Sequence, residues 1–200
     1  MRVAVKSIGP VEANCYILDR RIMIDPGDGI GELERFIAEE NAQIEAIVLT
    51  HGHFDHILGA AHIKKLTHAK IYIGAEDAEC LKDEDACCVL PYSTTPFEPV
   101  EPDAILSEGD IEIASLPFRV MLTPGHTKGG ICLISDASKL VFTGDTLFAR
   151  GFGRTDLRGG STKELYRSLR RLLELPGDYY AYPGHGEGAY ISDIKKGFAI

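Results

Sequence analysis

The chain has 200 residues and a mass of 21.9 kDa, long enough to bury the core of one domain. Its hydrophobic content of 44% and charged content of 26% exclude a disordered chain, and no apolar run approaches the ~18 residues of a membrane-spanning helix. The net charge of −9 argues against general nucleic-acid binding. We expect one domain over residues 1–200, with neither a membrane nor a nucleic acid as partner. Because the first residues lack a secretory signal, we also expect a cytoplasmic location.

The first half of the chain alternates strand-like runs with helical patterns. Apolar runs punctuated by turn residues predict strands over 3–8, 15–18, 22–24, 44–49 and 70–73. The spacing of Ile30, Leu33, Phe36 and Ile37 predicts one helix, and a second helix is expected over about 57–66. This alternation is typical of an α/β protein.

Residues 83–103 are predicted to form a long surface loop. The segment contains four prolines, which neither a helix nor a central strand would hold. It begins an acidic stretch, residues 83–118, with nine carboxylates and no Lys or Arg. A lid over a site and a plain insertion are both compatible with such a loop.

The second half predicts more strands and one strong helix. The strands are expected over 111–113, 118–122, 131–134, 140–142 and 179–182. The sequence Ser161-x-x-Glu164 is a capping box, and the leucines that follow it are spaced for one buried helix face. The elements of both halves together indicate two sheets covered by helices.

Four sharp turns carry the chemistry, and each follows a strand-like run. They are THGHFDH (50–56), TPGHTKGG (123–130), FTGDTLF (142–148) and YPGHG (182–186), and they contain five of the seven histidines. In open α/β architectures, ligands bind at the carboxyl ends of strands. Imidazoles and carboxylates are the expected ligands of zinc, iron or manganese. Four potential ligands within the six residues of HxHxDH therefore predict a metal site.

The order and spacing of these motifs resemble the metallo-β-lactamase superfamily. The resemblance implies a four-layer αβ/βα sandwich, with two mixed β-sheets flanked by helices and a two-metal site at one edge. Carried over by position, it implies one metal on His51, His53 and His126, a second on Asp55, His56 and His185, and a bridge between them at Asp145. It also matches Asp25 to an acid that supports the ligands in the family; a simple Asp-Pro-Gly turn is the alternative.

The segment GDTLFARGFGRTDLRGGS resembles glyoxalase II (hydroxyacylglutathione hydrolase) and its short bacterial relatives. This implies a hydrolase that cleaves an anionic thioester such as S-D-lactoylglutathione through a metal-bridging hydroxide. Zinc is the first choice for the two divalent ions, with iron and manganese as alternatives. Besides its role as a ligand, Asp55 would orient the water or accept its proton. Arg154 would bind a substrate carboxylate; a structural arginine is the alternative.

Two departures from glyoxalase II favour a broader or different thioester substrate. We expect no C-terminal helical domain for glutathione, and Asp156 stands where classical members place a tyrosine. A β-lactamase is disfavoured, because those enzymes are exported and the most familiar subclass has a cysteine at the position of Asp145. The runner-up is a persulfide dioxygenase with one iron on His51, His126 and Asp145. A metal-binding scaffold without catalysis is the remaining alternative, and the oligomeric state stays open.

Overall fold

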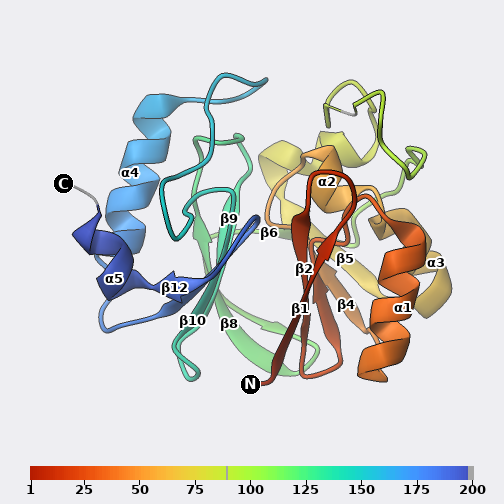
Figure 1. Cartoon of the computed structure of the whole chain (residues 1–200), viewed down its shortest axis with the longest axis horizontal. Helices are drawn as coiled ribbons and strands as arrows, with labels where there is room; N and C mark the ends of the chain where they lie inside the picture. Colours follow the sequence, from red (N-terminus) through yellow and green to blue (C-terminus); the bar gives the residue numbers. More distant parts are fainter. Residues whose placement is uncertain (89, 198–200) are drawn as a thin grey trace.

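Two six-stranded mixed sheets face each other in the computed structural model, which describes residues 1–88 and 90–197 (Figure 1). The first sheet has the order β1 (Val3–Ile8), β2 (Ala13–Leu18), β3 (Ile22–Ile24), β4 (Ala46–Val48), β5 (Lys70–Gly74) and β6 (Ala104–Leu106). The second has the order β12 (Ala189–Tyr190), β11 (Tyr180–Pro183), β10 (Leu140–Gly144), β9 (Ile131–Ser135), β8 (Leu116–Leu122) and β7 (Gly109–Ile113).

Helices cover the outer face of each sheet. Figure 1 shows α1 (Ile30–Glu40) and α3 (Ala60–Thr67) on the first sheet, and α4 (Thr162–Leu173) and α5 (Ile191–Lys196) on the second. The predicted four-layer α/β sandwich is therefore confirmed. Among the described residues, no helix has both the length and the apolar character needed to cross a membrane.

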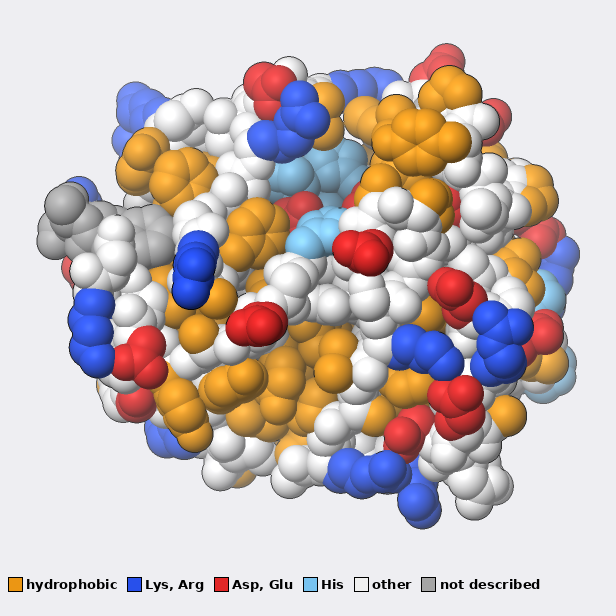
Figure 2. Space-filling model, viewed as in Figure 1, with side chains coloured by type: hydrophobic (Ala, Val, Ile, Leu, Met, Phe, Trp, Pro, Cys, Tyr) orange, Lys and Arg blue, Asp and Glu red, His pale blue; other side chains and the backbone are white. Residues whose placement is uncertain are grey.

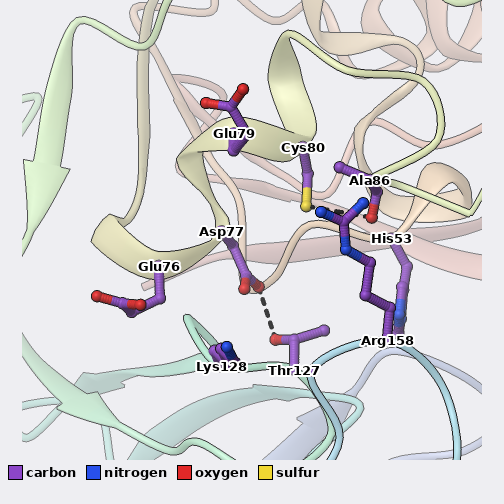
Figure 3. Close-up of a pocket in the computed structure, with 10 residues that line it drawn as sticks. His53, Glu76, Asp77, Glu79, Cys80, Ala86, Thr127, Lys128 and Arg158 are labelled. Atoms are coloured by element: carbon purple, nitrogen blue, oxygen red, sulfur yellow. Dashed lines mark hydrogen bonds between the residues drawn. The ribbon is translucent and has the colours of Figure 1, made fainter.

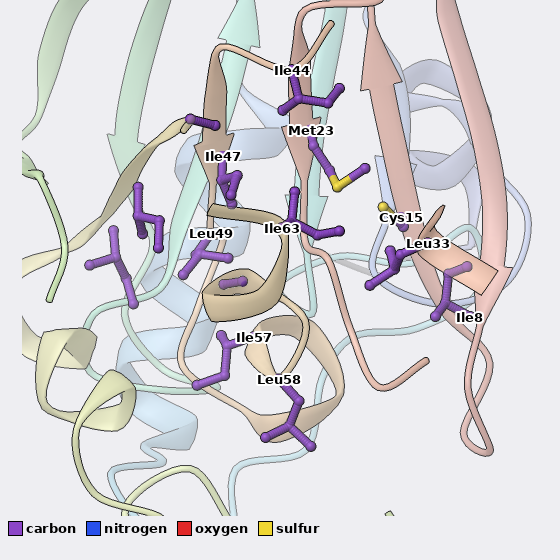
Figure 4. Packing of buried hydrophobic residues seen from close by; sticks show 14 of the residues in the cluster. Ile8, Cys15, Met23, Leu33, Ile44, Ile47, Leu49, Ile57, Leu58 and Ile63 are labelled. Carbon is purple, nitrogen blue, oxygen red and sulfur yellow. The ribbon is translucent and has the colours of Figure 1, made fainter. Parts of the chain in front are cut away.

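The central strands are apolar on both faces because each face is buried. In β2, Cys15 and Ile17 pack toward the helices, in the cluster that Figure 4 shows with Leu33. The alternate residues Tyr16 and Leu18 belong to the cluster between the two sheets. Successive side chains of a strand point to opposite faces of the sheet, and here each face packs in a different core. Both sets of side chains are therefore apolar, and the sequence shows continuous apolar runs.

The predicted helix over 57–66 is wrong at its beginning. The structure has two helices, α2 (Phe54–Ile57) and α3, with a break at Gly59. The Gly59 amide donates to the Pro26 carbonyl at 2.9 Å, and a Cβ at Gly59 would lie 2.3 Å from Leu33. The turn after β3 therefore packs directly on the backbone of this break. The short elements β6, β12 and α5 were not predicted from the sequence either.

The long loop is present and is attached to the body of the protein. It follows the 3₁₀ helix η1 (Ala75–Leu81), and its described residues form neither helix nor strand up to β6. The amides of Thr94 and Thr95 donate to the Asp28 carboxylate at 2.9 and 2.7 Å. One buried carboxylate thus fixes the middle of the loop, and its role as a lid stays a prediction.

Strand directions place the four motifs at one edge of the sandwich. Strands β3 to β6 run parallel, so the HxHxDH motif leaves β4 at the edge where β3 and β5 also end. In the second sheet, β8 and β10 are both antiparallel to β9, and β10 is parallel to β11. The remaining three motifs, which follow β8, β10 and β11, consequently emerge together.

Candidate metal centre

The structure brings the seven predicted ligands together in a hollow between the two halves, where Figure 2 shows histidine side chains. Their donor atoms form two groups, each within 4.8 Å: site A, with His51, His53 and His126, and site B, with Asp55, His56 and His185. Asp145 lies between them. Its Oδ2 is 3.5 Å from Nε2 of His126, and its Oδ1 is 3.6 Å from Nε2 of His56. The predicted bridging position is thus within reach of both groups.

Hydrogen bonds at the Nδ1 atoms of three histidines select the nitrogen that faces the centre. Nδ1 of His126 lies 2.8 Å from the Arg154 carbonyl and Nδ1 of His56 lies 3.0 Å from Oδ2 of Asp25. A carbonyl and a carboxylate only accept, so both Nδ1 atoms carry the proton. Nε2 is therefore the ring nitrogen that faces the centre and could bind a metal ion in each of these histidines.

The Nδ1 atom of His51 also carries the proton, because it donates to the hydroxyl of Thr50. Thr50 donates its Oγ1 proton to Asp25 at 2.6 Å, so this oxygen accepts from Nδ1 of His51, 3.0 Å away. The Nε2 of His51 is left with a lone pair. It is buried and has no partner among residues 1–88 and 90–197.

Two further histidines face a neighbour across the hollow. Nδ1 of His53 lies 2.8 Å from Nε2 of His126, and Nε2 of His185 lies 3.2 Å from Oδ2 of Asp55. His53 thus presents its Nδ1 atom, unlike the other ligands of site A. His185 is the most exposed of these imidazoles, with 28% of its side chain open to solvent.

Electrostatics differ between the two groups. Burial lowers the pKa of His51 well below its ordinary value, and burial together with His126 lowers the pKa of His53 to about 3. Burial also opposes a charge on His56, but Asp55 and Asp145 outweigh it and raise its pKa. The same balance lowers the pKa of Asp55. Without a metal, His51 and His53 of site A are therefore neutral imidazoles, whereas site B is an ion-paired set.

Asp25 holds the HxHxDH motif in place through hydrogen bonds to Thr50 and His56. Its carboxylate accepts from the Thr50 amide at 2.8 Å, from the Thr50 hydroxyl and from His56, and it is 1% exposed. Asp25 has a φ of 52°, a left-handed conformation that Asp tolerates better than most residues. The carboxylate therefore orients one ligand of each site, a use that goes beyond an Asp-Pro-Gly turn.

Asp77, at the start of η1, is a supporting carboxylate that the sequence did not reveal. It accepts from the amides of Gly52 and Gly129 at 2.9 and 2.7 Å, and from the Thr127 hydroxyl at 2.6 Å. These three donors lie in the loops that carry His53 and His126. Asp77 thus joins the two loops of site A.

Strand β2 holds the loop of His185, another contact that the sequence did not predict. The Asn14 amide donates to the Gly184 carbonyl at 2.7 Å, and its side chain donates to the Pro183 and Gly186 carbonyls. Backbone acceptors leave no motif in the sequence, so nothing in the pattern pointed to Asn14.

The side chain of Arg154 does not join the ligand cluster. It makes a two-pronged ion pair with Asp156, with both contacts at 2.7 Å, and 61% of it is exposed. Only its carbonyl touches the site, at Nδ1 of His126. A substrate carboxylate would have to displace Asp156, so its role in substrate binding stays a prediction.

The residues present fit divalent metal ions. Among the described residues, the buried side-chain atoms without a hydrogen-bond partner include Nε2 of His51 and Oδ1 of Asp145, and both belong to the predicted ligand set. An unpaired buried polar atom costs about 1–3 kcal/mol, which a coordinated cation would offset. Imidazole nitrogens and carboxylate oxygens suit zinc, iron and manganese alike.

Comparisons with known proteins agree with this geometry. The model of the metallo-beta-lactamase superfamily matches residues 8–185. The chain is 31% identical over 208 residues to the hydroxyacylglutathione hydrolase GloC of Haemophilus influenzae, covering 98% of this chain and 96% of that protein. The structure is similar to the BLEG-1 B3 metallo-beta-lactamase, with a TM-score of 0.88, 29% identity and coverage of 98% and 97%. It is also similar to TTHA1623 in a di-iron-bound form, with a TM-score of 0.81, 29% identity and coverage of 98% of both chains. The chain belongs to the metallo-β-lactamase superfamily.

Proposed function

We propose that the protein is a metal-dependent hydrolase of thioesters, similar in activity to hydroxyacylglutathione hydrolase. The observation that carries the proposal is that the imidazole nitrogens and carboxylate oxygens of sites A and B converge around Asp145. The identity to GloC supports the choice of a thioester. Zinc is the metal we propose first, with iron or manganese as alternatives.

The chain's own residues would do three things in this reaction. They would hold two divalent cations, whose chemistry is to lower the pKa of a water and to polarise a carbonyl. Asp55 is partly open to the hollow, with a side chain 12% exposed, so it can orient a water or accept its proton. A thiolate leaving group, with a pKa near ~8.5, departs without a strong general acid.

The test is the hydrolysis of S-D-lactoylglutathione by zinc-loaded and iron-loaded protein. His53→Ala removes a ligand of site A, and His62→Ala is the matched control, because His62 lies on α3 and pairs with Glu34. Turnover that disappears in His53→Ala and survives in His62→Ala supports the proposal. No turnover at full metal occupancy contradicts it. Assays with a cephalosporin and a lactone then ask which other acyl bond is cleaved.

A persulfide dioxygenase is the second candidate. Two of its three expected ligands, His51 and Asp145, carry the buried unpaired atoms of the cluster. Such an enzyme requires a single iron, so the number of metal ions per chain distinguishes it from the proposed hydrolase. One iron per chain with sulfur-dependent oxygen consumption would favour the dioxygenase, and two metal ions per chain with hydrolysis would exclude it.

A further inference from the structure

A polar cavity opens beside site A. It has a volume of about 180 Å³, and the ring of His53 forms part of its wall. Figure 3 shows its other walls: η1 with Asp77 and Cys80 above, and the loops of Lys128 and Arg158 below. His53 therefore belongs both to site A and to the wall of this cavity.

Two exposed cations, Lys128 and Arg158, line the cavity. The side chains of Lys128 and Arg158 make no hydrogen bond or ion pair with any residue in 1–88 or 90–197. Arg154, only four positions before Arg158, is by contrast fully paired with Asp156. Figure 3 shows the Arg158 guanidinium extending across the cavity toward Cys80.

The acidic residues of the same cavity do not neutralise these cations. Asp77 already accepts three hydrogen bonds from the ligand loops. Glu76 and Glu79 lie on the exposed side of η1, and Figure 3 shows their carboxylates directed away from Arg158. The cavity therefore has two solvent-exposed positive groups on its wall, next to the loop that carries His126.

We propose that Lys128 and Arg158 bind a carboxylate of the substrate, and that they select anionic thioesters over neutral ones. A guanidinium presents a planar pair of donors that matches a carboxylate, and the ammonium adds a second charge from the other side. Lys128 comes two residues after His126 in its loop, and Arg158 lies in the segment between Asp145 and α4. This inference rests on the proposed thioester hydrolysis and names its specificity residues.

Three thioesters test the inference with zinc-loaded protein. S-succinyl-N-acetylcysteamine carries a carboxylate on the acyl half, S-acetyl-3-mercaptopropionate carries one on the thiol half, and S-acetyl-N-acetylcysteamine is neutral. In Lys128→Gln and Arg158→Gln we expect KM to rise about tenfold for one of the anionic thioesters, with kcat unchanged. The half that responds shows which end of the substrate enters the cavity. KM for the neutral thioester should not change.

A matched control removes one positive charge elsewhere. Arg167 is exposed on α4, outside the cavity, so Arg167→Gln changes the net charge equally and should leave every KM unchanged. An unchanged KM for both anionic thioesters in the double variant Lys128→Gln/Arg158→Gln would overturn the inference. An equal rise for the neutral thioester would overturn it too, because a damaged site would then be the cause.

Binding can be measured without turnover, which separates this inference from the proposed function. In ¹H–¹⁵N NMR spectra of zinc-loaded protein titrated with succinate, the Lys128 and Gly159 amides should shift. The double variant should weaken the dissociation constant read from these amides at least about tenfold, and Arg167→Gln should not. Equal constants in the wild type and the double variant would refute the anion site. Binding lost in the double variant, in a protein that cleaves no thioester, would retain the site and reject the thioester.

Discussion

Sites A and B lie on either side of Asp145 but differ in how their polar groups are paired without a metal. Site A consists of three imidazoles, of which His51 has a buried Nε2 with no described partner. Site B combines a carboxylate with two imidazoles, and Oδ2 of Asp55 already lies 3.2 Å from Nε2 of His185. Site B therefore satisfies its own polar groups more completely than site A does.

The difference suggests an order of metal binding. A cation in site A gives a partner to Nε2 of His51 and replaces one contact between neutral rings, that of His53 with His126, whereas a cation in site B must replace ion pairs. We expect the first equivalent of zinc to enter site A. NMR signals of the His51 and His53 rings should change during the first equivalent, and those of His185 during the second; the reverse order would contradict this assignment.

The largest expected effect comes from the residue that both sites share. Asp145→Ala removes the carboxylate between His126 and His56, so both sites should lose affinity. Since loss of a partner behind a metal ligand alone costs about 10–100-fold, hydrolysis should fall by more than a hundredfold. Elemental analysis after gel filtration should find less than one metal per chain. Retention of two ions would show that Asp145 does not bridge.

Asp77 distinguishes site A from site B through stability. Asp77→Ala leaves two amides and a hydroxyl without their acceptor, at about 1–3 kcal/mol for each group that stays buried. We expect the free energy of unfolding to fall by about 3 kcal/mol, measured by urea denaturation at fixed zinc. A matched change, Glu76→Ala, affects an exposed neighbour on η1 and should cost below about 0.5 kcal/mol. Equal effects of the two changes would deny Asp77 this role.

A substitution of Asp25 tests whether this carboxylate orients the metal ligands. Asp25→Asn keeps the shape but removes the charge that accepts from His56 and Thr50. Metal affinity should fall about 10–100-fold, as expected for a group that orients ligands. Competition with a chelating dye measures it, and Asp28→Asn, in the same turn but bonded to the long loop, is the comparison. An unchanged affinity in Asp25→Asn would reduce Asp25 to a turn residue.

The contrast between these two carboxylates shows what the sequence could and could not predict. The fold was readable because apolar runs, turns and one capping box mark the strands and helices locally. Asp25 was readable because it stands directly after a strand, at a position known from the family. Asp77 was not, because its partners Gly52 and Gly129 lie 25 and 52 residues away and contribute only backbone amides. Contacts of this kind leave no pattern in the chain.

The smallest expected effect lies far from both sites and gives a reference for them. Arg119 donates to the Asp136 carboxylate at two 2.9 Å contacts, and together with Tyr179 it lowers the pKa of Asp136 to about 2, from an ordinary 3.8. A lowered pKa stabilises the fold above pH 4, and this contribution is lost as the pH falls toward 2.

Asp136→Asn should therefore lower the free energy of unfolding at pH 7 by less than about 1 kcal/mol, because solvent screens so exposed a pair. The difference from the wild type should shrink between pH 4 and pH 2 in urea denaturation. A difference that grows on acidification would show that another group controls the acid response. Metal loading should not alter it.

In both sheets the spatial order of the strands follows the chain, from β1 to β6 in the first and from β12 back to β7 in the second. This order bears on how the protein folds. Each pair of neighbouring strands in a sheet is also consecutive in sequence, so the sheets form from contacts that are closer along the chain than those of the centre. The metal centre is different, because Asn14 must meet Pro183 across 169 residues. We therefore expect the two sheets to fold first and the centre to assemble last, when the halves dock.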